Sequence, residues 1–107
     1  MVAGVKTGTG TNDNDVVIEL TRADPFRFFQ LQSTAGAMDV VVSFDGTNFS
    51  TAPLSLFDQG ATTNLPVLVT AADRTYQFSV ERAHTIRVLQ NGATAVEDAT
   101  LSYSTGD

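Results

Sequence analysis

The sequence contains no cysteine and no tryptophan, and it has one histidine in 107 residues. The absence of cysteine excludes disulfides and cysteine-based zinc sites. A single histidine, His84, excludes a multi-histidine metal site. Basic side chains are also few, 6 against 12 acidic ones, and the formal net charge of -6 would repel phosphate backbones. We therefore expect no nucleic-acid partner.

Long apolar stretches are missing as well. No segment approaches the roughly 20 apolar residues that span a bilayer, and the first ten residues lack the apolar region of a secretory signal. We therefore expect a soluble protein with no membrane partner. A chain of 107 residues fits one domain. Folding at this mass buries roughly 65% of the unfolded surface, which permits a core without disulfides.

Short stretches rich in valine, phenylalanine, leucine and threonine begin at Val16 and continue to Tyr103. Such residues favour strands, and alternation of apolar and polar positions indicates one buried face. In residues 38–44 the inward positions are Met38, Val40, Val42 and Phe44. Pro53 places residues 49–56 at a sheet edge or outside the sheet. The expected strands are residues 16–21, 26–32, 38–44, 49–56, 66–70, 75–80, 85–90 and 99–103. About eight strands at this spacing predict an all-β fold, an antiparallel β-sandwich of jelly-roll type.

The first fifteen residues, MVAGVKTGTGTNDND, have a different composition, with glycine, threonine, asparagine and aspartate around scattered apolar residues. Such a segment buries little apolar surface, and it predicts an extended or mobile arm. We therefore expect a flexible N-terminal arm at residues 1–15 and a single β-sandwich domain at residues 16–107.

Groups that could carry chemistry each have a simpler interpretation. His84 lies between two expected strands and is interpreted as a solvated loop residue. Residues 12–15 supply oxygen atoms but lack the glycine and glutamate of a calcium loop. No Gly-x-Ser-x-Gly motif occurs, and Gly8-Thr9-Gly10 does not match a phosphate-binding fingerprint. The sequence therefore predicts a protein that is not an enzyme, with no metal and no cofactor.

Three runs of the sequence resemble small β-sandwich proteins of tailed-bacteriophage virions. They are MDVVVSFDGTNFS at residues 38–50, TAPLSLFDQGAT after it, and IRVLQNGAT at residues 86–94. The resemblance implies a non-enzymatic capsid decoration (cement) protein, made in the host bacterial cytoplasm and located on the virion surface. It would bind the major capsid protein between subunits of the outer shell and stabilise the shell, with the chain forming homo-oligomers, of which a trimer is favoured.

The stretch VSFDGTNFS is also similar to the hairpin of discoidin-type carbohydrate-binding modules, although the tryptophan common on their ligand platforms is absent here. The alternative function is therefore a carbohydrate-binding module or a tail or surface adhesion protein. Phe49 and Phe57 flank loops near Pro53, where they either close one end of the sandwich or present apolar anchors to a partner. The candidate partner-binding residues are Val2, Val5, Lys6 and Asp15 in the arm, and Asn48, Phe49 and Phe57 in the sandwich.

Overall fold

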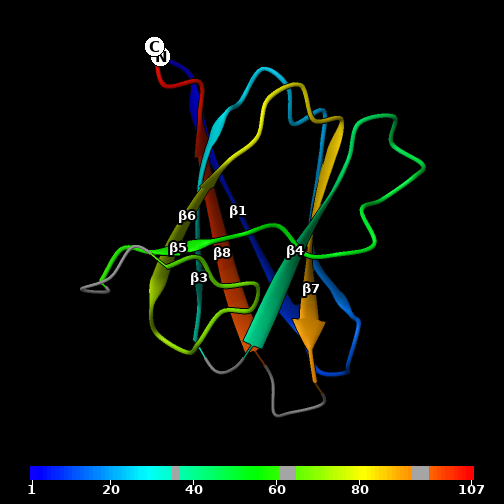
Figure 1. Ribbon diagram of the computed structural model, residues 1–107, viewed down its shortest axis with the longest axis vertical. Coiled ribbons are helices and arrows are strands. Elements are labelled where there is room, and N and C mark those ends of the chain that lie inside the picture. The colour runs from blue at the N-terminus through cyan, green and yellow to red at the C-terminus, as the bar shows by residue number, and fades with distance from the viewer. Residues whose placement is uncertain (35–36, 61–64, 93–96) are drawn as a thin grey trace.

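The computed structural model describes residues 1–34, 37–60, 65–92 and 97–107, and Figure 1 shows two β-sheets facing each other. Within these ranges the chain forms eight strands and no helix, which confirms the predicted all-β sandwich. The strands are β1 (Ala3–Gly10), β2 (Val16–Thr21), β3 (Phe28–Ser33), β4 (Ala37–Ser43), β5 (Phe57–Asp58), β6 (Thr75–Ser79), β7 (Thr85–Asn91) and β8 (Glu97–Ser104). No helix long and apolar enough to cross a membrane occurs in the described ranges.

The strand order is that of a long hairpin rolled into two layers. One sheet has the order β1-β8-β3-β6-β5 and the other has the order β2-β7-β4. The first strand pairs with the eighth, the second with the seventh and the third with the sixth, and each pair is antiparallel. Nested pairing of this kind is a jelly-roll arrangement. The strand spacing predicted a jelly-roll-like sandwich but not the strand order.

The core lies between the two sheets and follows the alternation of each strand. In β3 every second residue is buried, so Phe29 and Leu31 face the interior while Phe28 and Gln30 face outward. The Phe29 ring stacks on that of Phe78 in β6, with 5.0 Å between ring centroids and 9° between ring planes. Other fully buried side chains are Met38, Val40, Leu56, Ile86, Val88 and Leu101. These residues supply the apolar burial that stabilises the sandwich.

The structure differs from the expectation of a flexible arm at residues 1–15, because β1 pairs with β8 from Ala3 opposite Ser104 to Gly10 opposite Glu97. The sandwich therefore begins with β1. The face that β1 turns toward the interior carries glycines at positions 4, 8 and 10. At Gly8 an added Cβ would lie 1.7 Å from the Val17 carbonyl oxygen. Gly8 and Gly10 therefore allow β2 to pass close to β1, whereas Gly4 leaves room for the Tyr103 ring of β8.

Two segments expected as strands lack regular pairing. Residues 49–56 and 66–70 contribute two isolated bridges, Ser43 with Phe49 and Leu56 with Val67. The segment 49–54 still covers the outer edge of β4, because Ser50 N donates to Val42 O at 2.9 Å. Phe44, expected to point inward, is 64% exposed because β4 ends at Ser43 and the chain turns there.

The two chain ends lie side by side at one end of the molecule (Figure 1). Thr105 N donates to Val2 O at 2.9 Å, and Val2 N donates to Thr105 Oγ1 at 3.0 Å. The Met1 amino group lies 3.6 Å from a carboxylate oxygen of Asp107. These contacts extend the β1–β8 pairing beyond the last ladder pair.

Candidate binding groove

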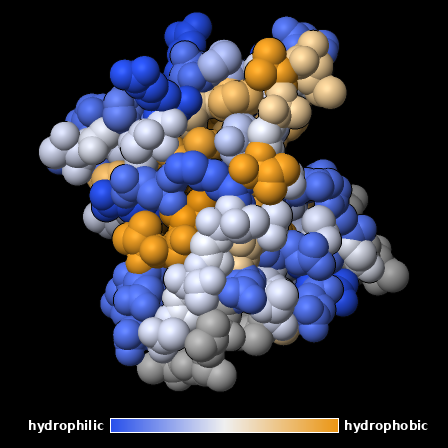
Figure 2. All heavy atoms as spheres, turned by 180° about the vertical axis from the view of Figure 1, so that it is seen from behind, coloured by the Kyte–Doolittle hydropathy of each residue, from blue (hydrophilic) through white to orange (hydrophobic). Residues whose placement is uncertain are grey.

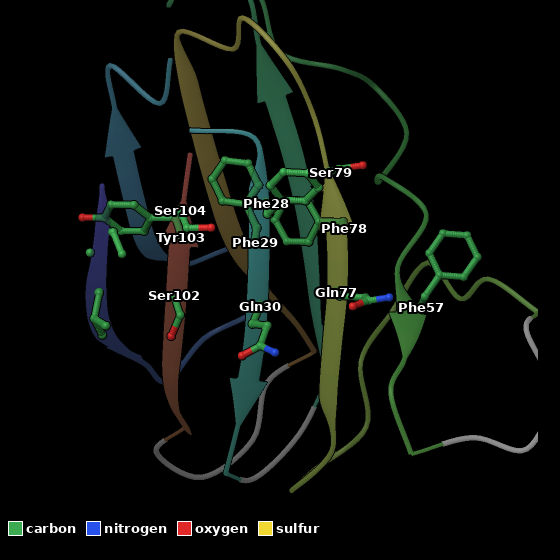
Figure 3. A pocket seen from close by; sticks show the side chains of 13 residues that line it. Phe28, Phe29, Gln30, Phe57, Gln77, Phe78, Ser79, Ser102, Tyr103 and Ser104 are labelled. Carbon is green, nitrogen blue, oxygen red and sulfur yellow. The ribbon is translucent and has the colours of Figure 1, made fainter. Parts of the chain in front are cut away.

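A groove of about 840 Å³ lies on the outer face of the five-stranded sheet, between two rows of side chains (Figure 3). The register of the strands defines both rows. One row runs across the sheet as Ala3, Ser104, Phe28 and Ser79, and the next runs as Val5, Ser102, Gln30, Gln77 and Phe57. The inward-facing residues Gly4, Phe29, Phe78 and Tyr103 occupy the positions between the rows and complete the groove lining. The site therefore follows directly from strand alternation and register.

None of the 13 residues that line the groove is charged, although the chain carries 6 basic and 12 acidic side chains. Figure 2 shows the molecule from behind, where hydrophobic patches lie among hydrophilic ones. The lining offers hydroxyls, amides and aromatic rings. Such a surface can bind uncharged groups but has no counter-charge for an ionic ligand.

Gln30 and Gln77, which line the groove, form a hydrogen-bonded chain with Gln59 beside it. Gln30 Nε2 donates to Gln59 Oε1 at 3.0 Å, and Gln59 Nε2 donates to Gln77 Oε1 at 3.1 Å. Gln30 and Gln77 are directly opposite each other on β3 and β6. Because each amide is fixed by its neighbour, the groups facing the groove are already oriented before any ligand binds.

Two exposed phenylalanines mark the groove, with 51% of Phe28 and 42% of Phe57 exposed. In Figure 3 the two side chains lie apart, with β6 running between them. The Phe28 ring packs on Gly106, where an added Cβ would lie 2.2 Å from the ring. On the Phe28 ring also lies the Arg27 guanidinium, whose carbon is 6.0 Å from the ring centroid. Phe28 is thus held in place although half of it faces solvent.

The structure brings two of the predicted partner-binding residues to this groove, Val5 and Phe57, at the two ends of one row. Phe28 is not among the residues predicted from the sequence, because phenylalanine in a strand is most often a core residue. Gln30 and Gln77 are not predicted either, because a single polar residue in a strand does not indicate a binding site. The alternation in β3 does indicate that Phe28 points outward, because Phe29 and Leu31 occupy the inward positions.

The other predicted contacts of the N-terminal segment make intramolecular bonds. Lys6 Nζ donates to Glu19 O at 2.7 Å, and Val2 bonds to Thr105. Asp15 accepts from the backbone N–H groups of Thr11 and Asn12, which lowers the pKa of its carboxyl below the usual value. Lys6 and Asp15 thus stabilise the β1–β2 region, whereas Val2 extends the pairing of β1 with β8.

Asn48 and Phe49 lie away from the groove, beside the three-stranded sheet. Asn48 Nδ2 donates to Asp45 Oδ2 at 2.7 Å, so the asparagine closes its own loop. The Arg87 guanidinium carbon lies 4.0 Å from the Phe49 ring centroid, and Arg87 Nε donates to Glu19 Oε2 at 2.6 Å. Both predicted contacts therefore have structural partners within the chain.

Asp45 organises the loop after β4. Its Oδ1 accepts from the backbone N–H groups of Asn48 and Thr47, both at 2.8 Å, and from the Ser43 hydroxyl at 2.9 Å. Hydrogen bonds from these donors, that of Asn48 N–H above all, hold the pKa of the Asp45 carboxyl far below its ordinary value. Because the pKa of this carboxyl is lower in the folded state than in the unfolded state, its ionised form stabilises the fold. That stabilisation is fully present above the unfolded-state pKa of about 3.9.

We expect Asp45→Asn to lower Tm at pH 7 and to flatten the acid dependence of Tm. In the native chain the stabilisation by the Asp45 carboxylate is lost as pH falls from about 4 toward the lower folded-state pKa. The amide in the variant does not titrate, so its stability has no such dependence on pH. Thermal unfolding at pH 7, 4 and 2 measures both effects. Asp73→Asn is the matched control, because the Asp73 carboxylate has no hydrogen-bond partner among the described residues. Equal pH profiles for native protein and Asp45→Asn would contradict this role.

A second exposed surface is the apolar stretch of residues 65–69, which we call the side segment. Leu65 is 73% exposed, Leu68 50% and Val69 37%. The backbone in and just after the side segment is hydrogen-bonded toward both sheets, across the open side of the sandwich. Val67 N donates to Leu56 O at 2.8 Å beside β5, and Thr70 N donates to Met38 O at 2.9 Å on β4. The side segment thus closes the side of the sandwich while presenting two leucines outward.

Other candidate chemistry remains isolated in the described part of the chain. His84 is exposed in the turn before β7, with its Nδ1 2.7 Å from Thr85 Oγ1 and its ring against Gly46. Among the described residues, no three or more histidine, aspartate or glutamate side chains group closely enough to hold a metal ion.

Comparison with models of known protein families and with curated proteins gives no match. Among solved structures, the chain is similar to the SPBc2 prophage-derived protein YomS, with a TM-score of 0.70 and 11% sequence identity. The match covers 97% of this chain and 96% of the YomS chain. At this identity the likeness shows the fold, and the chain has the fold of a prophage-derived protein over nearly its whole length.

Proposed function

We propose that this chain is a non-enzymatic structural protein of a tailed-bacteriophage virion, a capsid decoration protein that binds the major capsid protein on the outer shell. The observation that carries the proposal is the exposed side segment, with Leu65 73% exposed and Leu68 50% exposed. The shared fold with a prophage-derived protein supports a phage origin.

The side segment has the properties of a protein-docking anchor. Contiguous apolar side chains exposed on a small protein mark interaction sites more often than singly scattered ones do. Hydrogen bonds from Val67 to Leu56 and from Thr70 to Met38 fix the backbone on either side of Leu68. Binding through a pre-positioned segment costs little conformational entropy, so the buried leucines contribute more of their transfer free energy to affinity.

Copies at neighbouring positions of the shell would add their affinities. A homotrimer at a three-fold junction engages three side segments at once, and each later contact then forms at high effective concentration. The formal net charge of -6 discourages binding to the packaged genome and keeps the free protein soluble in the host cytoplasm before assembly. Individually modest contacts are sufficient under this arrangement.

We expect the double variant Leu65→Ser/Leu68→Ser to lose capsid binding while staying folded. Co-sedimentation with capsids of the phage that encodes the chain measures the occupancy. Loss of each well-packed apolar anchor costs about 1.4 kcal/mol, or tenfold in affinity, so the double variant should bind about a hundredfold more weakly. Val16→Ser is the matched control, because Val16 is 48% exposed but lies outside the side segment. Absence of native protein from the capsid pellet would reject the function, and equal binding of the double variant would reject this contact.

A further inference from the structure

We infer that the groove on the five-stranded sheet binds an uncharged oligosaccharide, of at least two sugar units, through its glutamine amides and its two exposed phenylalanines. This inference is independent of capsid docking, since it uses the outer face of the sheet and none of the side segment.

The absence of charge selects the class of ligand. None of the groove-lining residues is charged, so a phosphate, carboxylate or ammonium group placed among them would be desolvated without a counter-ion in the lining. The lining is not purely apolar either, because Ser102, Ser104, Gln30 and Gln77 carry hydroxyls and amides. A neutral ligand rich in hydroxyl groups satisfies both conditions.

The glutamine chain leaves one acceptor and one donor at its ends. Gln30 Nε2 and Gln77 Oε1 are used within the chain, whereas Gln30 Oε1 and Gln77 Nε2 have no hydrogen-bond partner among the described residues. The two residues are directly paired, so their Cβ atoms lie about 5 Å apart. One sugar hydroxyl can donate to Gln30 Oε1 while a neighbouring hydroxyl accepts from Gln77 Nε2. Adjacent hydroxyls on a pyranose ring meet this requirement.

The phenylalanines supply apolar surface for the C–H faces of sugar rings. Phe28 is on β3 and Phe57 is on β5, with β6 between them, as Figure 3 shows. Strands in a sheet lie about 4.8 Å apart, so the two residues are about 10 Å apart across the sheet. That separation exceeds one sugar ring and favours an oligosaccharide. The volume of about 840 Å³ lies in the range of small-ligand sites.

The test is binding of the full chain to a panel of neutral and acidic oligosaccharides, followed by titration calorimetry with the best neutral one. We expect binding to one or more neutral glycans, and at least tenfold weaker binding by Gln77→Glu and by Phe57→Ala. Gln32→Glu is the matched control, because Gln32 is exposed on the same sheet face in the next row, outside the groove. It should bind as the native chain does. Tm values identify any variant that fails to fold.

Three outcomes would overturn the inference. The first is no binding of the native chain to any neutral glycan at millimolar concentration, and the second is native affinity in both folded groove variants. The third is a native oligomer, seen by light scattering, that Gln77→Glu dissociates and Gln32→Glu does not. That result would make the face an interface between copies of the chain. Capsid co-sedimentation of Gln77→Glu keeps the two proposals separate, since it should equal that of the native protein.

Discussion

Deletion of residues 1–10 is expected to abolish cooperative folding. The deletion removes all of β1, which pairs with β8 from Ala3 to Gly10. It leaves β8 as an unpaired sheet edge and removes the cover over this side of the core. Each backbone hydrogen bond of the ladder contributes about 0.5 to 1.5 kcal/mol net, so losing all of them removes a free energy comparable to the roughly 5 to 15 kcal/mol by which a domain of this size is stable. Circular dichroism during heating should show no sharp transition.

The opposite result has a clear meaning as well. A truncated chain that unfolds cooperatively near the native Tm would show that residues 1–10 act as a detachable arm, as their composition indicates. Amide hydrogen exchange of the native chain gives an independent readout. Strong protection of the β1 amides that bond to β8 supports the strand, whereas exchange at the rate of an unstructured peptide contradicts it.

Gly8→Ala is expected to be the most destabilising single substitution outside the apolar core. The new Cβ would lie 1.7 Å from the Val17 carbonyl oxygen, and the neighbouring atom is backbone, so β1 and β2 must move apart. Overpacking of this kind costs about 3 kcal/mol. For a domain of about 100 residues this lowers Tm by roughly 15 °C. Thermal unfolding by calorimetry measures the shift.

Thr7→Ala is the matched control, because Thr7 precedes Gly8 on the same strand, pairs with Thr100 and is exposed. It changes the outer face and should leave Tm within a few degrees of native. Similar Tm values for Gly8→Ala and Thr7→Ala would show that β1 and β2 do not pack closely at Val17. The comparison thus tests one interstrand contact directly.

Most of the fold could be predicted from the sequence because apolar alternation is strong where one face of a strand is buried. That condition holds for β3, β6 and β7, and their residues were placed within one or two positions. It fails for β1, whose inward face carries Gly4, Gly8 and Gly10 in place of apolar side chains. It fails again at residues 66–70, where the apolar residues close the side of the sandwich without joining a ladder.

The groove was harder to predict because it depends on register between distant strands. The sequence indicates Val5 as a contact of the N-terminal arm and Phe57 as an apolar anchor. Only the pairing through Ser102, Gln30 and Gln77 places the two residues in one row. The hairpin motif predicts Asn48 as a partner contact, but in the structure its side chain bonds to Asp45 and closes the loop. A single strand pattern indicates which side chains face outward, and the strand order decides which of them become neighbours.

The adjacency of the two chain ends determines how the protein responds to mechanical load. Because β1 and β8 are antiparallel and Met1 lies beside Asp107, tension applied between the ends opens their ladder from one end, one hydrogen-bonded pair after another. Rupture of such a zipper requires far less force than shearing all pairs together. In the proposed capsid role, load would therefore have to enter through the sheet faces and sides, because an attachment through both termini would peel β1 away.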